Sequence, residues 1–204
     1  MMIRTSIQKQ WNYAKRHKDF EKHKQEIQKV LYQDPKKVYS QATPESRKLF
    51  NLYSNVMNDI GRLFWMLRLE VNKHGLLYAK YTPEHQIEDC IVWRFAFRFP
   101  LFVVALESRR GCFVGFRNQI KKYNSRIESI IRMVEKEFPV NDILKNMEKF
   151  DISLWKSFVD SQTSLDKPNP KLFSKQIPKK YHNIKTLEYE IKLHKANKEL
   201  KEFF

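Results

Sequence analysis

The sequence CIVWRFAFRFPLFVVAL, residues 90–106, is the longest apolar stretch of the chain, and only Arg94, Arg98 and Pro100 interrupt it. A membrane-spanning helix needs about 20 apolar residues, and two arginines near its middle would cost several kcal/mol. The stretch therefore does not predict a transmembrane helix, although an interfacial or re-entrant position stays open. Because Pro cannot continue a helix, Pro100 predicts an end or a kink there.

The two arginines of this stretch stand four residues apart, on one face of a helix. No carboxylate lies three or four residues away from either of them along the chain. A buried guanidinium without a partner is costly, so we expect both to find a carboxylate or a phosphate elsewhere. An intramolecular pair with Glu70 or Glu135 is one solution. The other solution is a group outside the chain, on a partner subunit, a lipid or an RNA phosphate. The cations that follow along the chain would contact the same group: Arg109, Arg110 and Arg117.

Two copies of a helix-start signal, Thr-Pro-Glu, occur at residues 43–45 and 82–84. The Thr hydroxyl can accept from backbone amides, Pro suits the first turn, and an acid complements the positive helix end. Apolar residues after the first copy recur every three or four positions, which predicts a helix over residues 44–74 that ends before Gly75. The second copy leads into a predicted helix over residues 87–99.

The same spacing predicts a third helix over residues 116–138, ended by Pro139. A shorter apolar segment, an irregular Lys/Pro arm and a final helix are predicted at residues 143–158, 161–180 and 181–204. We accordingly divide the chain into three domains: a basic amphipathic segment (1–42), a helical core (43–160), and an arm with a terminal helix (161–204).

The composition supports a helical class. Fifteen Phe, nine Tyr and four Trp exclude a disordered polybasic chain. Only 4 glycines argue against many strands, because hairpin turns favour Gly. We expect an all-α protein, a bundle of three to four long helices with extended basic N-terminal and C-terminal arms. In such a bundle the step Gly111-x-x-x-Gly115 would let another helix approach closely.

The net charge of +16 is spread evenly along the chain. Residues 1–102 hold 18 basic and 10 acidic side chains, and residues 103–204 hold 21 and 13, so each half carries +8. A diffuse excess suits ribosomal RNA, acidic protein partners or an imported protein better than one DNA-binding block. Cys90 and Cys112 each lie in an apolar run, which predicts buried thiols in a reducing compartment.

The first 18 residues contain five cations and no acid. Ile3, Ile7, Trp11 and Ala14 fall on one side of a helix. The segment resembles a mitochondrial targeting sequence, and an ordinary basic first helix is the alternative.

Catalytic motifs are not evident. The six histidines lack metal-binding spacing, and no Gly-rich phosphate loop or nucleophile elbow occurs. Arg16 and His23 fit the loose R-x(4-6)-H pattern of HEPN ribonucleases, and Arg117 with Asn118 resembles its start without the histidine. We therefore expect no enzyme activity and no cofactor, and keep a HEPN-type ribonuclease as an alternative.

Residues 47–64 resemble the LYR-motif proteins of mitochondria, through Leu52, Tyr53 and Phe64, with Ser54 in place of the motif's arginine. That family forms three-helix bundles that serve as accessory subunits or assembly factors of respiratory complexes and often bind an acyl carrier protein. The resemblance implies these partners for this chain.

From these features we expect a non-catalytic accessory subunit of a mitochondrial inner-membrane assembly, either a respiratory-chain complex or ATP synthase. We expect it on the matrix side of the membrane or in contact with anionic lipid. It would act by protein contacts, with Trp11, Trp65, Trp93 and Trp155 as candidate anchors. A mitochondrial ribosomal or other RNA-binding protein is the second expectation.

Overall fold

The structure, a computed structural model, describes residues 2–117, 119–140, 144, 175, 177–182, 184, 187 and 191–192. The chain divides into two compact units. Unit 1 consists of Met1–Trp65 and Pro83–Arg94, and unit 2 consists of Met66–Thr82 and Phe95–Phe204. Most of the predicted apolar segment, arm and terminal helix, together with Trp155, lies outside the described residues.

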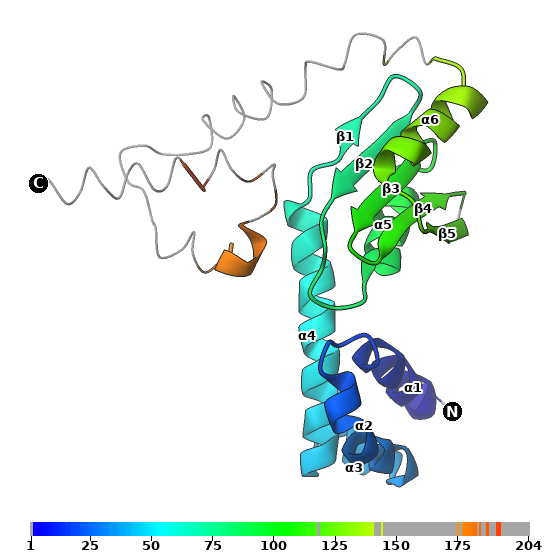
Figure 1. Cartoon of the computed structure of the whole chain (residues 1–204). Coiled ribbons are helices and arrows are strands. Elements are labelled where there is room, and N and C mark those ends of the chain that lie inside the picture. Colours follow the sequence, from blue (N-terminus) through cyan, green and yellow to red (C-terminus); the bar gives the residue numbers. More distant parts are fainter. Residues whose placement is uncertain are drawn as a thin grey trace, which may run out of the picture. The chain divides into compact units, whose positions relative to one another are not determined.

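Unit 1 is helical, and its first helices lie beside the long helix α4 (Figure 1). Its elements are α1 (Met2–Ala14), α2 (Phe20–Gln28), the 3-10 helix η1 (Lys29–Tyr32), α3 (Pro35–Tyr39), α4 (Pro44–Met66) and the first part of α5 (Glu88–Arg98). Apolar side chains from α1 to α4 form one core: Ile7, Trp11, Ala14, Phe20, Ile27, Val30, Val38, Leu49 and Leu52. The predicted apolar face of the first helix is therefore confirmed at its three described positions.

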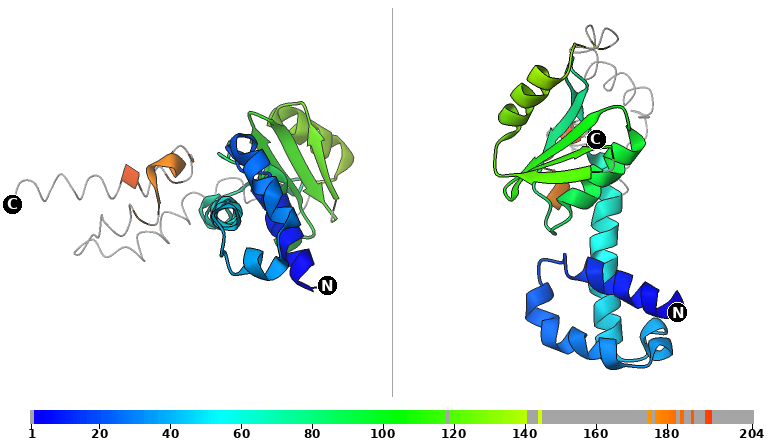
Figure 2. Two further views of the ribbon diagram at one scale, coloured as in Figure 1. Left: turned by 90° about the horizontal axis from the view of Figure 1, so that it is seen from below. Right: turned by 90° about the vertical axis from the view of Figure 1, so that its right-hand side faces the viewer.

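Unit 2 is built on a five-stranded sheet whose spatial order follows the chain. The strands are β1 (Glu70–Val71), β2 (Leu76–Lys80), β3 (Val103–Ser108), β4 (Gly111–Phe116) and β5 (Gln119–Tyr123). β2 and β3 are parallel, with Leu76 opposite Val103, and the other pairs are antiparallel. Helix α6 (Ile127–Glu137) covers one face of the sheet, as Figure 2 shows, and the 3-10 helix η2 (Lys179–Tyr181) follows later in the chain.

The apolar stretch 90–106 forms two elements, most of helix α5 and the first part of strand β3. Residues Val103–Leu106 are all buried, including those that point away from α6. A parallel pair needs a crossover connection, here through α5, and a strand buried on both faces has no polar alternation. The predicted helix end before Pro100 is confirmed, because α5 ends at Arg98.

The all-α expectation is wrong, because unit 2 contains a mixed sheet. The small number of glycines does not exclude this sheet, because its turns need few of them. Gly75 (φ +81°) lies in the β1–β2 turn, and Gly111 (φ +119°) lies at the β3–β4 turn. Between β4 and β5, Arg117 adopts φ 45° without a glycine, and β2 is connected to β3 through helix α5. Gly111 and Gly115 lie on strand β4, so the predicted helix-packing step does not exist.

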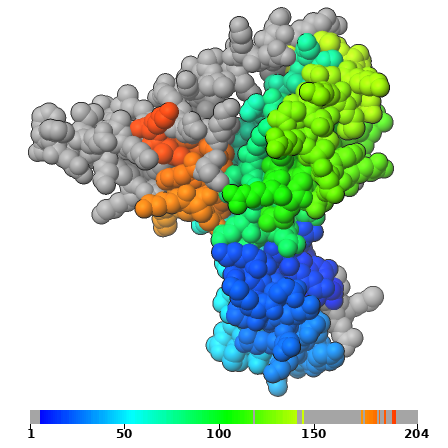
Figure 3. Space-filling model, in the orientation of Figure 1, coloured from blue at the N-terminus to red at the C-terminus, as the bar shows by residue number. Residues whose placement is uncertain are grey.

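Two predicted helices are shorter than expected. The helix over residues 44–74 ends at Met66, and the chain continues into strands β1 and β2. Within residues 116–138, only Ile127–Glu137 is helical, and the preceding part forms the end of β4 and strand β5. Among the described residues, no helix combines the length and the apolar character needed to cross a bilayer. Figure 3 shows the surface of α6 (yellow-green) beside the green strands of unit 2.

Candidate functional site

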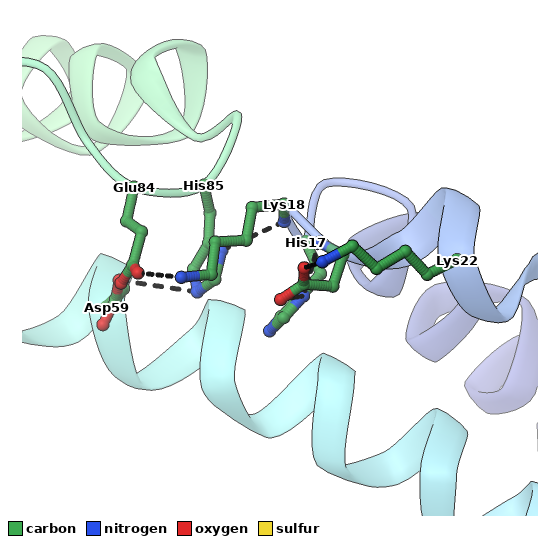
Figure 4. A network of polar contacts seen from close by, with 7 residues as sticks. His17, Lys18, Lys22, Asp59, Glu84 and His85 are labelled. Atoms are coloured by element: carbon green, nitrogen blue, oxygen red, sulfur yellow. Dashed lines mark hydrogen bonds and ion pairs between the residues drawn. The ribbon is translucent and has the colours of Figure 1, made fainter.

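A polar cluster lies in unit 1, where the loop after α1, helix α4 and the loop before α5 meet (Figure 4). Asp59 and His85 are each only 3% exposed, and His17 is 9% exposed. The ligand atoms of Asp59, Glu84 and His85 all lie within 4.8 Å of one another, so these three residues are a candidate metal site. Two carboxylates and an imidazole are also common ligands of divalent transition metals.

The hydrogen bonds of the cluster do not fit a metal centre. His85 Nδ1 accepts from the backbone N–H of Lys18 at 3.3 Å. In the neutral ring Nε2 therefore carries the proton, and it faces Asp59 Oδ2 at 3.5 Å. The ammonium of Lys18 donates to Glu84, so a cation of the protein already neutralises this carboxylate. The cluster stabilises the joining of three segments within unit 1.

His17 extends the cluster, since its ring lies 4.3 Å from that of His85, measured between centroids. His17 Nδ1 accepts from the backbone N–H of Asp19 at 3.1 Å. Burial lowers the pKa of His17, and the neighbouring His85 lowers it further. The neutral ring is therefore the form that this environment favours.

Beside the cluster, Arg16 is held firmly. Its Nη1 and Nη2 atoms donate to the two carboxylate oxygens of Asp89 at 2.5 and 2.8 Å, and Nη1 also donates to the carbonyl of Gln86. The Asp89 bond raises the pKa of Arg16. The other residue of the HEPN-like pattern, His23, faces Glu26 on α2 at 3.6 Å. The two residues thus have different structural partners.

A second candidate site is the hairpin of β4 and β5 in unit 2, with its flanking turns, residues 109–126. We call it the basic hairpin. It contains no Asp or Glu and holds six cations: Arg109, Arg110, Arg117, Lys121, Lys122 and Arg126. All except the half-buried Arg110 are exposed. No salt bridge joins the exposed five to a carboxylate within the described part of the chain.

Two acids near the basic hairpin, Glu107 on β3 and Glu128 on α6, are already engaged. Lys80 on β2 reaches Glu128 at 2.5 Å and Glu107 at 3.3 Å. Glu107 also accepts from the backbone N–H of Ile127 at the start of α6. The contact with Lys80 lowers the pKa of Glu128. Lys80 therefore partly neutralises these two carboxylates.

Aromatic side chains alternate with these cations. The Lys122 ammonium lies 5.7 Å from the Phe113 ring centroid, directly across the β4–β5 pair. Arg117 lies 5.0 Å from the centroid of Phe116 at the other end. Successive residues of a strand point to opposite faces, so Lys121 and Lys122 present charge on both sides of the ribbon. Such a surface combines charges for phosphates with rings for bases.

Only part of the basic hairpin was predicted from the sequence. The predicted binding residues included Arg109, Arg110 and Arg117 but not Lys121, Lys122 and Arg126, which were expected on a helix. The absence of acids from residues 109–126 was the signal that could have revealed them.

The remaining predicted arginines are placed differently. Arg98 is exposed, 5.5 Å from the Phe99 ring, and Arg94 is half-buried, 5.9 Å from the Phe64 ring. The expectation of an anionic partner assumed that both guanidinium groups are buried. Neither side chain is fully buried, so burial does not require such a partner. Of the cysteines, Cys112 is buried and Cys90 half-buried.

The comparisons with known proteins identify the family. The family model of DUF4130, described as a domain of unknown function, matches residues 18–186, and the chain belongs to this family. No curated protein and no solved structure matches the chain. The resemblance to LYR-motif proteins was wrong: Leu52 belongs to the core of unit 1, Tyr53 contacts Tyr13, and Phe64 contacts Trp65.

Proposed function

We propose that this protein is a non-catalytic nucleic-acid-binding protein that contacts the phosphate backbone through the basic hairpin. One observation carries the proposal: residues 109–126, the β4–β5 hairpin with its turns, hold six cations and no acid, and five of these cations are exposed. Antiparallel ribbons are established readers of nucleic acids, and phosphate contacts need several cations within one footprint.

The test measures the affinity of the full chain for a single-stranded oligonucleotide as a function of salt. Each phosphate contact contributes about −0.7 to the slope of log K against log salt for single strands. The double variant Lys121→Ala with Lys122→Ala should weaken binding and make the slope less negative by about 0.7 for each lost contact.

The control is Lys36→Ala with Lys37→Ala, which removes another adjacent and exposed pair, on α3 in unit 1. This control should bind like the unaltered chain. Equal affinities for both double variants, or a flat salt response, would refute the proposal. Lys121 and Lys122 would then only protect the edge strand β5 from pairing with another chain.

A role as an accessory subunit of a larger assembly is a second proposal. It is supported by exposed aromatic side chains in unit 1, Trp65 at 72% and Trp93 at 48%. Aromatic residues dominate the energetics of protein interfaces. Co-purification of the tagged chain tests this role: Trp65→Ala with Trp93→Ala should lose a stable partner, and unchanged recovery would contradict it. The mitochondrial inner membrane stays a prediction, which cell fractionation tests.

A further inference from the structure

A half-open cavity of about 210 Å³ lies between α6 and the α6-facing side of the basic hairpin. Three aromatic residues line it: Phe116 of β4, Tyr123 of β5 and Phe138 after α6. The rings of Phe116 and Phe138 meet edge to face at 5.7 Å. Three exposed polar residues also line it, Gln119, Lys121 and Glu137, and the rest of the lining is apolar. The cavity thus shares Lys121 and one strand face with the basic hairpin.

The size and chemistry of this cavity restrict its ligand. Pockets for drug-sized ligands measure about 300–1,000 Å³, so this cavity suits a smaller ligand, and its aromatic lining favours a planar ring. An amide, an ammonium and a carboxylate together offer hydrogen-bond donors and acceptors. The carboxylate of Glu137 disfavours an anionic ligand, while a neutral ring with polar edges suits all three groups. A nucleobase has this chemistry.

We propose that the cavity binds one unpaired base of a single-stranded nucleic acid whose phosphates lie along the basic hairpin. This inference rests on the proposed function and adds the class of ligand. A base can enter only when it is unstacked and unpaired, which favours single strands, loops and ends over a regular duplex. Stacking on aromatic side chains is sequence-tolerant because every base has a π-face.

The experiment compares two strands with equal numbers of phosphates, about 12 nucleotides long. One is oligodeoxythymidine, and the other is an abasic strand of the same length. Their electrostatic attraction to the basic hairpin is the same, so a difference in affinity reports the bases. The full chain should bind the base-bearing strand about tenfold more tightly.

Two variants assign this preference to the cavity. Met133→Trp places a ring in the cavity from α6, and it should abolish the preference while affinity for the abasic strand stays unchanged. Tyr123→Leu keeps an apolar side chain but removes a ring, and should reduce the preference several-fold. The control is Tyr39→Leu, which removes an exposed ring from α3 in unit 1, away from the residues that line the cavity. It should keep the preference.

The outcomes separate the two proposals. Equal, salt-dependent binding of both strands would overturn the base pocket and leave backbone binding intact. The base pocket would also be overturned if both cavity variants kept the preference, or if Tyr39→Leu removed it. If neither strand binds, the proposed function fails and this inference fails with it. Circular dichroism of each variant confirms its fold, and Tyr123→Leu keeps the test decisive if Met133→Trp does not fold.

Discussion

Gly111 is the residue on which the basic hairpin depends most directly. It starts β4 with φ +119°, a conformation that residues with a Cβ rarely adopt. A Cβ added there would lie 2.8 Å from the backbone oxygen of Tyr123 at the end of β5. The backbones of the two strand ends therefore approach each other as closely as only glycine permits.

We predict that Gly111→Ala lowers the free energy of unfolding by at least about 1–2 kcal/mol, because it adds backbone strain and a steric clash. Gly61→Ala is the matched control: Gly61 lies inside α4 and an added Cβ would meet nothing within 4 Å. This control should stabilise the protein by about 0.5–1 kcal/mol. Urea denaturation measures both, and equal effects of the two substitutions would contradict the prediction.

His17 makes stability depend on pH. Because burial lowers its pKa in the folded state, the unfolded chain binds the proton more readily. This contribution is fully present above the unfolded pKa of about 6.5, and it is lost as the pH falls from there towards the lowered folded pKa. The groups facing His17 are His85, Asp19, Lys18 and Glu84.

We predict that His17→Asn reduces the loss of unfolding free energy between about pH 7 and about pH 5. The Asn oxygen can still accept from the N–H of Asp19. Asn12→Ala, which removes an exposed and uncharged side chain from α1, serves as the control and should keep the original pH dependence. Denaturant titrations at several pH values measure the effect. An unchanged pH profile in His17→Asn would argue against this assignment.

At the scale of elements, two identical start signals have different roles. Thr43 begins α4 with a reciprocal cap: its hydroxyl accepts from Ser46 N at 3.2 Å, and Ser46 Oγ accepts from Thr43 N at 3.1 Å. Thr82 instead accepts from Arg109 N at 2.9 Å, at the turn between β3 and β4. The predicted cap is thus confirmed for the first copy and wrong for the second.

We predict that Thr43→Ala costs about 1 kcal/mol of stability, because it removes the cap of α4. Thr82→Ala should leave helical stability unchanged and increase amide hydrogen exchange at Arg109. Hydrogen exchange resolved by residue measures both effects. If the α4 amides near Ser46 stay protected from hydrogen exchange in Thr43→Ala, the cap does not stabilise this helix end.

At the scale of the whole molecule, the net charge of +16 sets the response to salt. A large net charge destabilises a compact state through self-repulsion, and salt screens this repulsion. We predict that the thermal midpoint of the isolated chain rises between about 0.05 M and about 0.5 M KCl. A nucleic acid that binds the folded state should raise the midpoint at low salt and lose this effect at high salt. A midpoint that falls as salt is added would contradict the prediction.

The sequence by itself determined those features that depend on neighbours along the chain. Helical spacing located α1, α4 and α5, Pro100 marked the end of α5, and Thr43 marked the start of α4. These signals arise from backbone sterics and from contacts within one or two turns, which any reader of the sequence can evaluate.

Only the tertiary structure decided which segments become strands and which cations share a surface. Val103–Leu106 is buried on both faces of the sheet, so all four residues are apolar. Periodicity cannot distinguish such a strand from a segment of a buried helix. Lys121 and Lys122 lie on β5 because pairing with β4 supplies their segment with backbone hydrogen bonds. The cations of residues 109–126 are already clustered in the sequence, and the pairing of β4 with β5 decides that they lie on a hairpin and not along a helix.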